Sequence, residues 1–214
     1  MIKVIAIDGP ASSGKGTVAN ILAAQLGFAY LESGVIYRAL GWWVNKHYPE
    51  QDVSEQQVVD LIASMQLEFK AGLIWLNNED VTEQLRAESI GMLASKYSSI
   101  AEVRARLLQF QRDFATAPGL VTDGRDMGSV VFPNANLKVF LTASAEKRAE
   151  RRYKQLHQFD KAVTMGAILQ DIITRDEQDS QRSVAPLSYD SSYRVLDNSE
   201  LSIDETISLI KAWL

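Results

Sequence analysis

The 214-residue chain has no cysteine and little histidine. The absence of cysteine excludes disulfide bonds, thiol nucleophiles and thiolate metal sites. Its two histidines, His47 and His157, lie in polar stretches that we expect to be exposed. We therefore expect neither a histidine general base nor a histidine-rich metal site.

The chain also lacks an excess of positive charge and any long apolar run. Its net charge of -5 argues against a nucleic-acid polymer or an anionic membrane as the main partner. No apolar run approaches the length of about 20 residues that a transmembrane helix needs, and residues 3–8 enter a strand-like run instead of a charged leader. Because 46% of the residues are hydrophobic, a sizeable core is expected. These features predict a soluble, cytoplasmic protein.

The most informative segment that is present is a glycine-rich turn between an apolar strand and a helical pattern. It consists of Gly9, Pro10, Ala11, Ser12, Ser13, Gly14, Lys15, Gly16 and Thr17. Glycine allows the backbone to curl so that successive N–H groups point at a phosphate, and the helix N-terminus adds partial positive charge. Lys15 supplies a point charge for the outer phosphates, and the Thr17 hydroxyl is a ligand for Mg²⁺. We therefore predict a phosphate-binding loop.

The position of the hydroxyl narrows the class of protein. Gly16 follows Lys15, so the hydroxyl comes one place later than in the general motif, at Thr17. In this ending the loop resembles the nucleoside monophosphate kinases more than the GTPases.

Strand-like runs alternate with helical segments along the chain. The apolar runs are 4–7, 28–31, 120–122, 137–141 and 193–196. This alternation predicts an α/β fold with a parallel sheet covered by helices on both faces. Two helix starts are marked by caps, one at Ser144 and one at Ser202 with Glu205 three residues later.

Residues 64–82 depart from this alternation of strands and helices. The runs 66–70 and 73–77 flank Ala71-Gly72, which predicts a β-hairpin, and residues 79–82 can add a third short strand. An antiparallel piece inside an α/β chain indicates an inserted subdomain.

Two more polar clusters follow predicted strands. The first contains Ser33, Tyr37 and Arg38, and the second is the run 122–128, Thr-Asp-Gly-Arg-Asp-Met-Gly. In an open parallel sheet, ligands bind beyond the carboxyl ends of the strands, so these clusters should lie on the same rim as the phosphate-binding loop. Taken alone, the first cluster is equally compatible with an ordinary strand-to-helix turn. Asp123 can orient Mg²⁺ through water or cap the loop, and the sequence leaves both roles open.

Together these motifs, with Arg175, Asp179 and Arg182 before Ala185-Pro186-Leu187, resemble the bacterial cytidylate kinases over essentially the whole chain. The resemblance implies a P-loop NTPase fold with a five-stranded parallel sheet flanked by helices. It implies one domain over residues 1–214, with a small antiparallel β insert in a nucleoside monophosphate-binding region at about 39–100 and a short lid at about 150–163. The implied reaction is phosphoryl transfer from ATP, with Mg²⁺, to CMP or dCMP, giving ADP and CDP or dCDP.

The resemblance also implies roles for individual residues. The ATP phosphates and Mg²⁺ would be held by residues 9–17, with Thr17 as the metal ligand and Arg151 in the lid over ATP. Lys15, Arg38, Arg125 and Arg182 would be catalytic, the three arginines holding the acceptor phosphate. Ser95, Arg104 and Asp126 would recognise cytosine, and Ser33, Arg175 and Asp179 would line the sugar.

The chemistry of cytosine agrees with this set. A carboxylate accepts from the N4 amine, and an arginine and a hydroxyl donate to N3 and O2. Uracil would instead present an O4 acceptor to Asp126. Ser95 and Arg104 lie on what we predict to be one helix with Leu93, Val103 and Leu107, where such residues are usually solvated.

Two alternatives remain, one within the kinases and one from another class of function. One is a kinase of the same fold that acts on UMP, AMP or another small acceptor. The other is a nucleotide-binding regulatory switch or slow NTPase, although the Asn-Lys-x-Asp motif of GTPases is absent. The resemblance, through its short lid, also implies a monomer, and nothing in the apolar pattern requires a partner.

Overall fold

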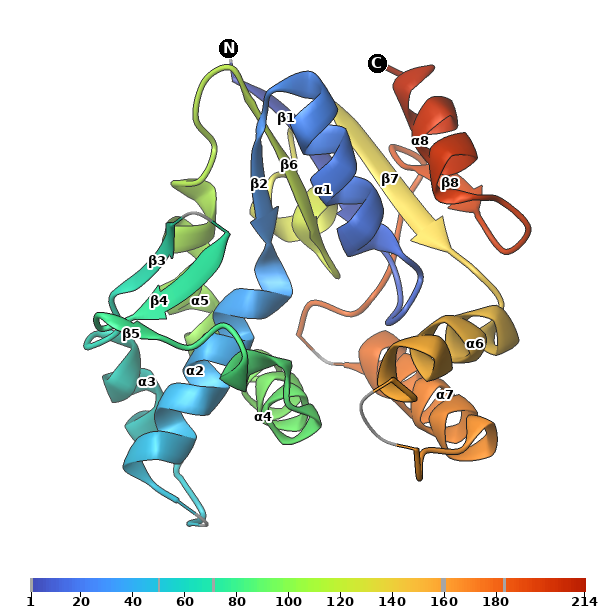
Figure 1. The fold of residues 1–214 in the computed structure, drawn as a ribbon. Coiled ribbons are helices and arrows are strands. Elements are labelled where there is room, and N and C mark those ends of the chain that lie inside the picture. Colours follow the sequence, from blue (N-terminus) through green and yellow to red (C-terminus); the bar gives the residue numbers. More distant parts are fainter. Residues whose placement is uncertain (1, 50, 71, 159–160, 183) are drawn as a thin grey trace. The chain divides into compact units, whose positions relative to one another are not determined.

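The computed structural model describes residues 2–49, 51–70, 72–158, 161–182 and 184–214. Residues 159–160 of the expected lid and Ala71 of the expected hairpin turn lie outside them. The chain divides into two compact units, one made of residues 1–31 and 114–214 and the other of residues 32–113 (Figure 1). Within the described ranges, no helix combines the length and apolar character needed to cross a bilayer.

The first unit is built on a five-stranded sheet in the order β2-β6-β1-β7-β8. Its strands are β1 (Lys3–Asp8), β2 (Ala29–Glu32), β6 (Gly119–Gly124), β7 (Leu137–Thr142) and β8 (Arg194–Asp197). Its helices are α1 (Lys15–Leu26), α6 (Ala145–Leu156), α7 (Met165–Gln181) and α8 (Ile203–Lys211), and a π-helical turn, η2, spans Met127–Val131. The β1–β6, β1–β7 and β7–β8 ladders are parallel, which confirms the predicted fold class.

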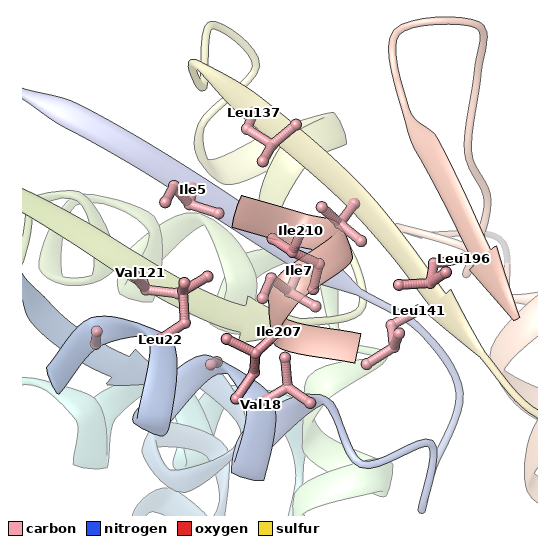
Figure 2. Close-up of a cluster of buried hydrophobic side chains, with 13 residues drawn as sticks. Ile5, Ile7, Val18, Leu22, Val121, Leu137, Leu141, Leu196, Ile207 and Ile210 are labelled. Atoms are coloured by element: carbon pink, nitrogen blue, oxygen red, sulfur yellow. The ribbon is translucent and has the colours of Figure 1, made fainter. Parts of the chain in front are cut away.

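The core of this unit lies between the sheet and two helices. Ile5 and Ile7 of β1 pack with Val18 and Leu22 of α1. Ile207 and Ile210 of α8 belong to the same cluster, as do Val121, Leu137, Leu141 and Leu196 from the neighbouring strands (Figure 2). Because side chains alternate along a strand, Asp8 points to the opposite face from Ile5 and Ile7.

The register of β1 determines which loops begin next to each other. Asp8, the last residue of β1, pairs with Gly124, the last residue of β6. The phosphate-binding loop and the segment that begins at Arg125 therefore leave the sheet side by side. This is the strand-end arrangement that the sequence predicted.

Both predicted helix caps are present. The Ser144 hydroxyl accepts from the backbone N–H of Lys147 at the start of α6. Ser202 and Glu205 form a capping box at the start of α8. Residues 176–181 form the last turns of α7.

The second unit holds α2 (Ser33–His47), α3 (Glu55–Ile62), α4 (Glu88–Ser98), α5 (Ala101–Arg112) and the short 3-10 helix η1 (Gln84–Arg86). Its antiparallel sheet has the order β3-β4-β5, with strands Leu67–Lys70, Leu73–Leu76 and Glu79–Asp80. The hairpin and the third short strand are thus confirmed, and Gly72 in the turn has a φ of 78°.

A prediction about the helices of this unit was wrong. Ser95 and Arg104 do not share one helix, because α4 ends at Ser98 and α5 begins at Ala101. The Ser98 and Ser99 hydroxyls donate to the carbonyls three residues earlier, and Ile100 is extended with φ -81° and ψ 120°. Serine side chains that bond to the local backbone compete with continued helix, so the chain turns here.

Candidate active site

The phosphate-binding loop curls between β1 and α1. Gly14, just before α1, has a left-handed φ of 88°, which glycine adopts without steric cost. A Cβ on Gly9 would lie 2.1 Å from the carbonyl oxygen of Leu141, so only glycine fits there. Lys15 begins α1, and its Nζ donates to the Pro10 carbonyl at 3.0 Å across the curl. This hydrogen bond therefore holds the charged Lys15 ammonium group against the backbone of the loop.

The outer carbonyls of the same loop are bound by side chains from α6 and from the end of β8. The Ser13 carbonyl accepts from Arg151 Nη1 and from Asn198 Nδ2, each at 3.1 Å. Arg151 also bonds the Oδ1 and carbonyl oxygens of Asn198. Arg148 Nη1 donates to the Ala11 carbonyl at 3.3 Å. These side chains bind carbonyl oxygens of the loop and leave its backbone N–H groups to bind an anion.

Arg148 is a buried side chain that forms an ion pair. Its guanidinium bonds both oxygens of Asp176 on α7, at 3.0 and 2.5 Å. Its Nε donates to the Ala143 carbonyl at 2.9 Å. Arg148 thus joins α6, α7 and the phosphate-binding loop.

Oxygen donors of the kind that Mg²⁺ prefers lie beside the loop. The buried Asp123 carboxylate accepts from the Tyr30 hydroxyl at 2.8 Å. A Cβ on Gly16 would be 3.8 Å from Asp123 Oδ2, so this carboxylate faces the loop. Thr17 is exposed in the first turn of α1. A hydroxyl and a carboxylate suit Mg²⁺, which is usually held by few protein ligands together with substrate phosphates. Within the described residues, no cluster of three or more acidic, histidine or cysteine side chains could hold a metal by itself.

Two of the predicted phosphate-binding arginines converge on one carboxylate. Asp179, near the end of α7, accepts from Arg125 Nε at 2.6 Å through one oxygen and from Arg182 through the other. Burial lowers the pKa of Arg125, while Asp123 and Asp8 act in the opposite sense. Arg175 lies on the same helix, half-buried, and burial lowers its pKa as well. The arrangement gathers cationic groups in a partly dry site, which suits an anionic ligand.

The loop after β6 carries Asp126 next to Arg125. Asp126 is buried and precedes η2, and its carbonyl accepts from the backbone N–H groups of Val130 and Val131 at 2.9 and 3.2 Å. The backbone N–H groups of Met127 and Gly128 donate to the carboxylate of Asp8 at 2.8 Å each. The segment that holds Arg125 and Asp126 is therefore anchored to the end of β1.

The other predicted acceptor residues belong to the second unit. Ser33, the first residue of α2, is buried and donates to Oε1 of the buried Gln111 at 2.8 Å. Arg38, one turn further along α2, donates to the carbonyls of Leu85 and Ala87 at 2.8 and 3.3 Å. Its guanidinium lies so close to α4 that a Cβ on Gly91 would be 2.9 Å from Nη2.

The two predicted base-contacting residues of this unit flank the break between α4 and α5. Arg104 donates to the Ser98 carbonyl at 3.1 Å, and its guanidinium lies 5.5 Å from the ring centroid of Tyr37. Ser95 is half-buried on α4. Arg104, in α5, thus lies over the ring of Tyr37, a geometry that stabilises a guanidinium.

The prediction that both histidines are exposed was wrong for one of them. His47 is exposed, whereas His157 is half-buried and stacks on Tyr153 with ring centroids 4.8 Å apart. The contact depends on the end of α6, which composition alone does not reveal.

With this geometry established, comparison with known proteins identifies the family. The cytidylate kinase family model matches residues 5–213. The chain belongs to the cytidylate kinase family. A cytidylate kinase of Chromobacterium violaceum is 50% identical over 212 residues, covering 99% of this chain and 95% of that protein. One of Neisseria gonorrhoeae is 49% identical, covering 99% and 96% respectively. The resemblance inferred from the motifs is thereby confirmed.

A solved structure gives independent support for the fold alone. An uncharacterized protein from Eubacterium ventriosum superimposes with a TM-score of 0.56 at 15% identity, covering 100% of this chain and 98% of that one.

Several residues of this kinase-family site escaped the sequence interpretation. Asp8, Gln111, Asn198 and Tyr193 are buried, and each bonds a predicted site residue or the loop that carries one. Only Asp8 gave a usable signal, a carboxylate that ends an otherwise apolar strand directly before the glycine-rich turn.

Proposed function

We propose that the protein transfers the γ-phosphoryl group of ATP to the phosphate of CMP or dCMP, giving ADP and CDP or dCDP. The observation that supports it best is the pairing of two anion sites in one unit. One is the phosphate-binding loop with Lys15, and the other is the Arg125 and Arg182 pair on Asp179. A phosphotransferase between two phosphates needs a donor site and an acceptor site of this kind.

The obstacle to the reaction is repulsion between two anions. Lys15 would neutralise charge on the transferred group, while Arg38, Arg125 and Arg182 would hold the acceptor phosphate in line. The acceptor oxygen already carries negative charge, so no strong general base is required. Mg²⁺, bound with ATP, would neutralise phosphate charge, and Thr17 would be its protein ligand with Asp123 nearby. The backbone of residues 9–17 would contact the ATP phosphates, and Arg151 would support this loop and lie over ATP.

Selection of cytosine would depend on three polar groups. The Asp126 carboxylate would accept from the N4 amine, and Arg104 and Ser95 would donate to N3 and O2. Ser33, Arg175 and Asp179 would lie along the sugar. Regions at about 39–100 and 150–163 would serve as the nucleotide-binding insert and the lid that exclude water. We expect a cytoplasmic monomer with small nucleotides as its only substrates.

An acceptor panel tests the proposal. ADP release would be followed in a coupled assay with Mg-ATP and CMP, dCMP, UMP, AMP, GMP or no acceptor. We expect strong turnover with CMP and dCMP and little with UMP. Activity with another acceptor only would overturn the assignment of the base-binding residues. ADP release that does not depend on an acceptor would place the protein among hydrolases or switches.

A further inference from the structure

Asp8 is a fully buried carboxylate that accepts hydrogen bonds from the loop after β6 and from Tyr193. Its Oδ1 accepts from the N–H of Met127 at 2.8 Å. Its Oδ2 accepts from the N–H of Gly128 and from the Tyr193 hydroxyl, both at 2.8 Å. The first N–H groups of a helical turn have no partner inside the turn, so Asp8 supplies from β1 what a local cap would otherwise supply.

Sheet packing alone gives no reason for a carboxylate at this position. The four residues before it, Val4–Ile7, are buried and apolar. Burial raises the pKa of Asp8, and the hydrogen bonds from Gly128, Met127 and Tyr193 oppose that rise. A buried carboxylate without such partners would be strongly unfavourable. Its presence here is therefore tied to the backbone that it binds.

Tyr193 lies so close to the backbone of Gly128 that a side chain at position 128 would clash with it. A Cβ on Gly128 would lie 2.6 Å from the Tyr193 hydroxyl oxygen and 3.0 Å from Cγ of Lys138. The Tyr193 ring thus limits the loop from one direction while Asp8 holds it from another. Together they leave residues 127–128 little freedom to move.

Asp8 also connects the two halves of the proposed reaction. It directly precedes Gly9 of the phosphate-binding loop, and it pairs in the sheet with Gly124. The residues that it anchors directly follow Arg125 and Asp126, which we propose as contacts of the acceptor. The phosphate-binding loop has separate supports in Lys15, Arg148, Arg151 and Asn198. Loss of the Asp8 contacts would therefore affect the acceptor side more than the ATP side.

We propose that Asp8, supported by Tyr193, is a positioning residue that holds the Arg125–Asp126 segment in register with the phosphate-binding loop. This inference rests on the proposed function. Transfer is sensitive to placement, since a displacement of about 1 Å can cost about 100-fold in rate. An asparagine at position 8 would keep the shape but turn an amide N–H₂ toward a backbone N–H, so one of the two anchors would be lost.

The test compares Asp8→Asn, Tyr193→Phe and the control Asp190→Asn. Asp190 also accepts from a backbone N–H and a hydroxyl, both of Ser192, but on the surface. For Asp8→Asn we expect kcat with CMP to fall about 100-fold and the CMP-to-UMP ratio of kcat/KM to fall, with the ATP Kd within about threefold. For Tyr193→Phe, which loses one hydrogen bond, we expect a fall of about fivefold in kcat. Asp190→Asn should match the wild type.

Amide hydrogen exchange tests the same contacts without measuring catalytic activity. The amides of Met127 and Gly128 should exchange faster in both variants, whereas amides in α1 should not change. A variant that is merely less stable would lose kcat in proportion to its folded fraction and keep its KM and its CMP-to-UMP ratio, and that result would overturn the inference. If Asp8→Asn does not fold, Tyr193→Phe alone tests the inference. A Tyr193→Phe variant with the CMP-to-UMP ratio and the amide exchange rates of the wild type would overturn it. If the wild type phosphorylates neither CMP nor dCMP, the proposed function fails and this inference falls with it.

Discussion

The carboxylate of Asp179 lies 2.6 Å from Nε of Arg125 and at the same time accepts a hydrogen bond from Arg182. These residues come from different elements, since Asp179 is in α7 and Arg125 directly follows β6. One buried carboxylate therefore orients two arginines that we propose for the acceptor phosphate. Its role in holding them can be separated from a contact with the sugar.

We expect Asp179→Asn to lower kcat for CMP at least about tenfold, because the amide can accept from only one arginine and leaves the other misplaced. Asp171→Asn, at an exposed position of the same helix, is the control. Steady-state kinetics with CMP and dCMP should show equal losses if Asp179 acts through the arginines. A loss confined to CMP would instead indicate a contact with the 2′-hydroxyl.

Asp126 should control the choice between cytosine and uracil. We expect Asp126→Ala to reduce the ratio of kcat/KM for CMP to that for UMP by roughly 100-fold, because the wild-type carboxylate would face a lone pair of uracil. Total turnover should fall less than this ratio. The acceptor panel measures both, and a variant with wild-type selectivity would contradict the assignment.

Arg148 should contribute to both stability and ATP binding. Its guanidinium side chain is 6% exposed and that of its partner Asp176 is 31% exposed. Removing one partner of such a pair leaves a poorly compensated charge, so Arg148→Ala should lower the free energy of unfolding by about 3 kcal/mol. Because Arg148 also binds the Ala11 carbonyl, the KM for ATP should rise more than the KM for CMP.

Urea denaturation and kinetics measure these effects. Arg106→Ala is the control, since its pair with Glu102 is exposed and should contribute less than about 1 kcal/mol. Equal free energies of unfolding for the two variants would show that the buried ion pair contributes no more to stability than the exposed one.

The capping box of α8 predicts a pH-dependent contribution to stability. Ser202→Ala should lower the free energy of unfolding by about 1 kcal/mol at neutral pH, the usual cost of a lost serine cap. The Ser202 hydroxyl and backbone N–H lower the pKa of Glu205 below 4.5. A lowered carboxylate pKa stabilises the fold above the unfolded value, and that stabilisation is lost as the pH falls through the folded value.

The difference between wild type and Ser202→Ala should therefore shrink as the pH falls below about 4. Urea denaturation across this range measures it, with Ser208→Ala, exposed on the same helix, as the control. A difference that stays constant with pH would show that Glu205 takes no part.

The sequence alone determined the phosphate-binding loop, the five strands, the antiparallel insert and the family. Each depends on short-range patterns, such as glycine at Gly9 and Gly14, apolar runs bounded by turns, and caps at Ser144 and Ser202. Strand-end logic also predicted correctly that the segment after β6 begins beside the phosphate-binding loop, since parallel strands leave their carboxyl ends on one edge. These features need only a few neighbouring residues to form.

The tertiary structure decided which polar groups bind one another. Asp179 and Arg125 are 54 residues apart, and Asp8 and Tyr193 are 185 apart, so no local pattern reveals either pair. The sequence analysis also missed the break between α4 and α5, because helical propensity continues through it. In the structure, hydrogen bonds from the Ser98 and Ser99 hydroxyls to the local backbone accompany the end of α4. Local propensity acts over a few residues, whereas the partner of a buried charge is chosen by sheet register and packing, which the folded chain alone supplies.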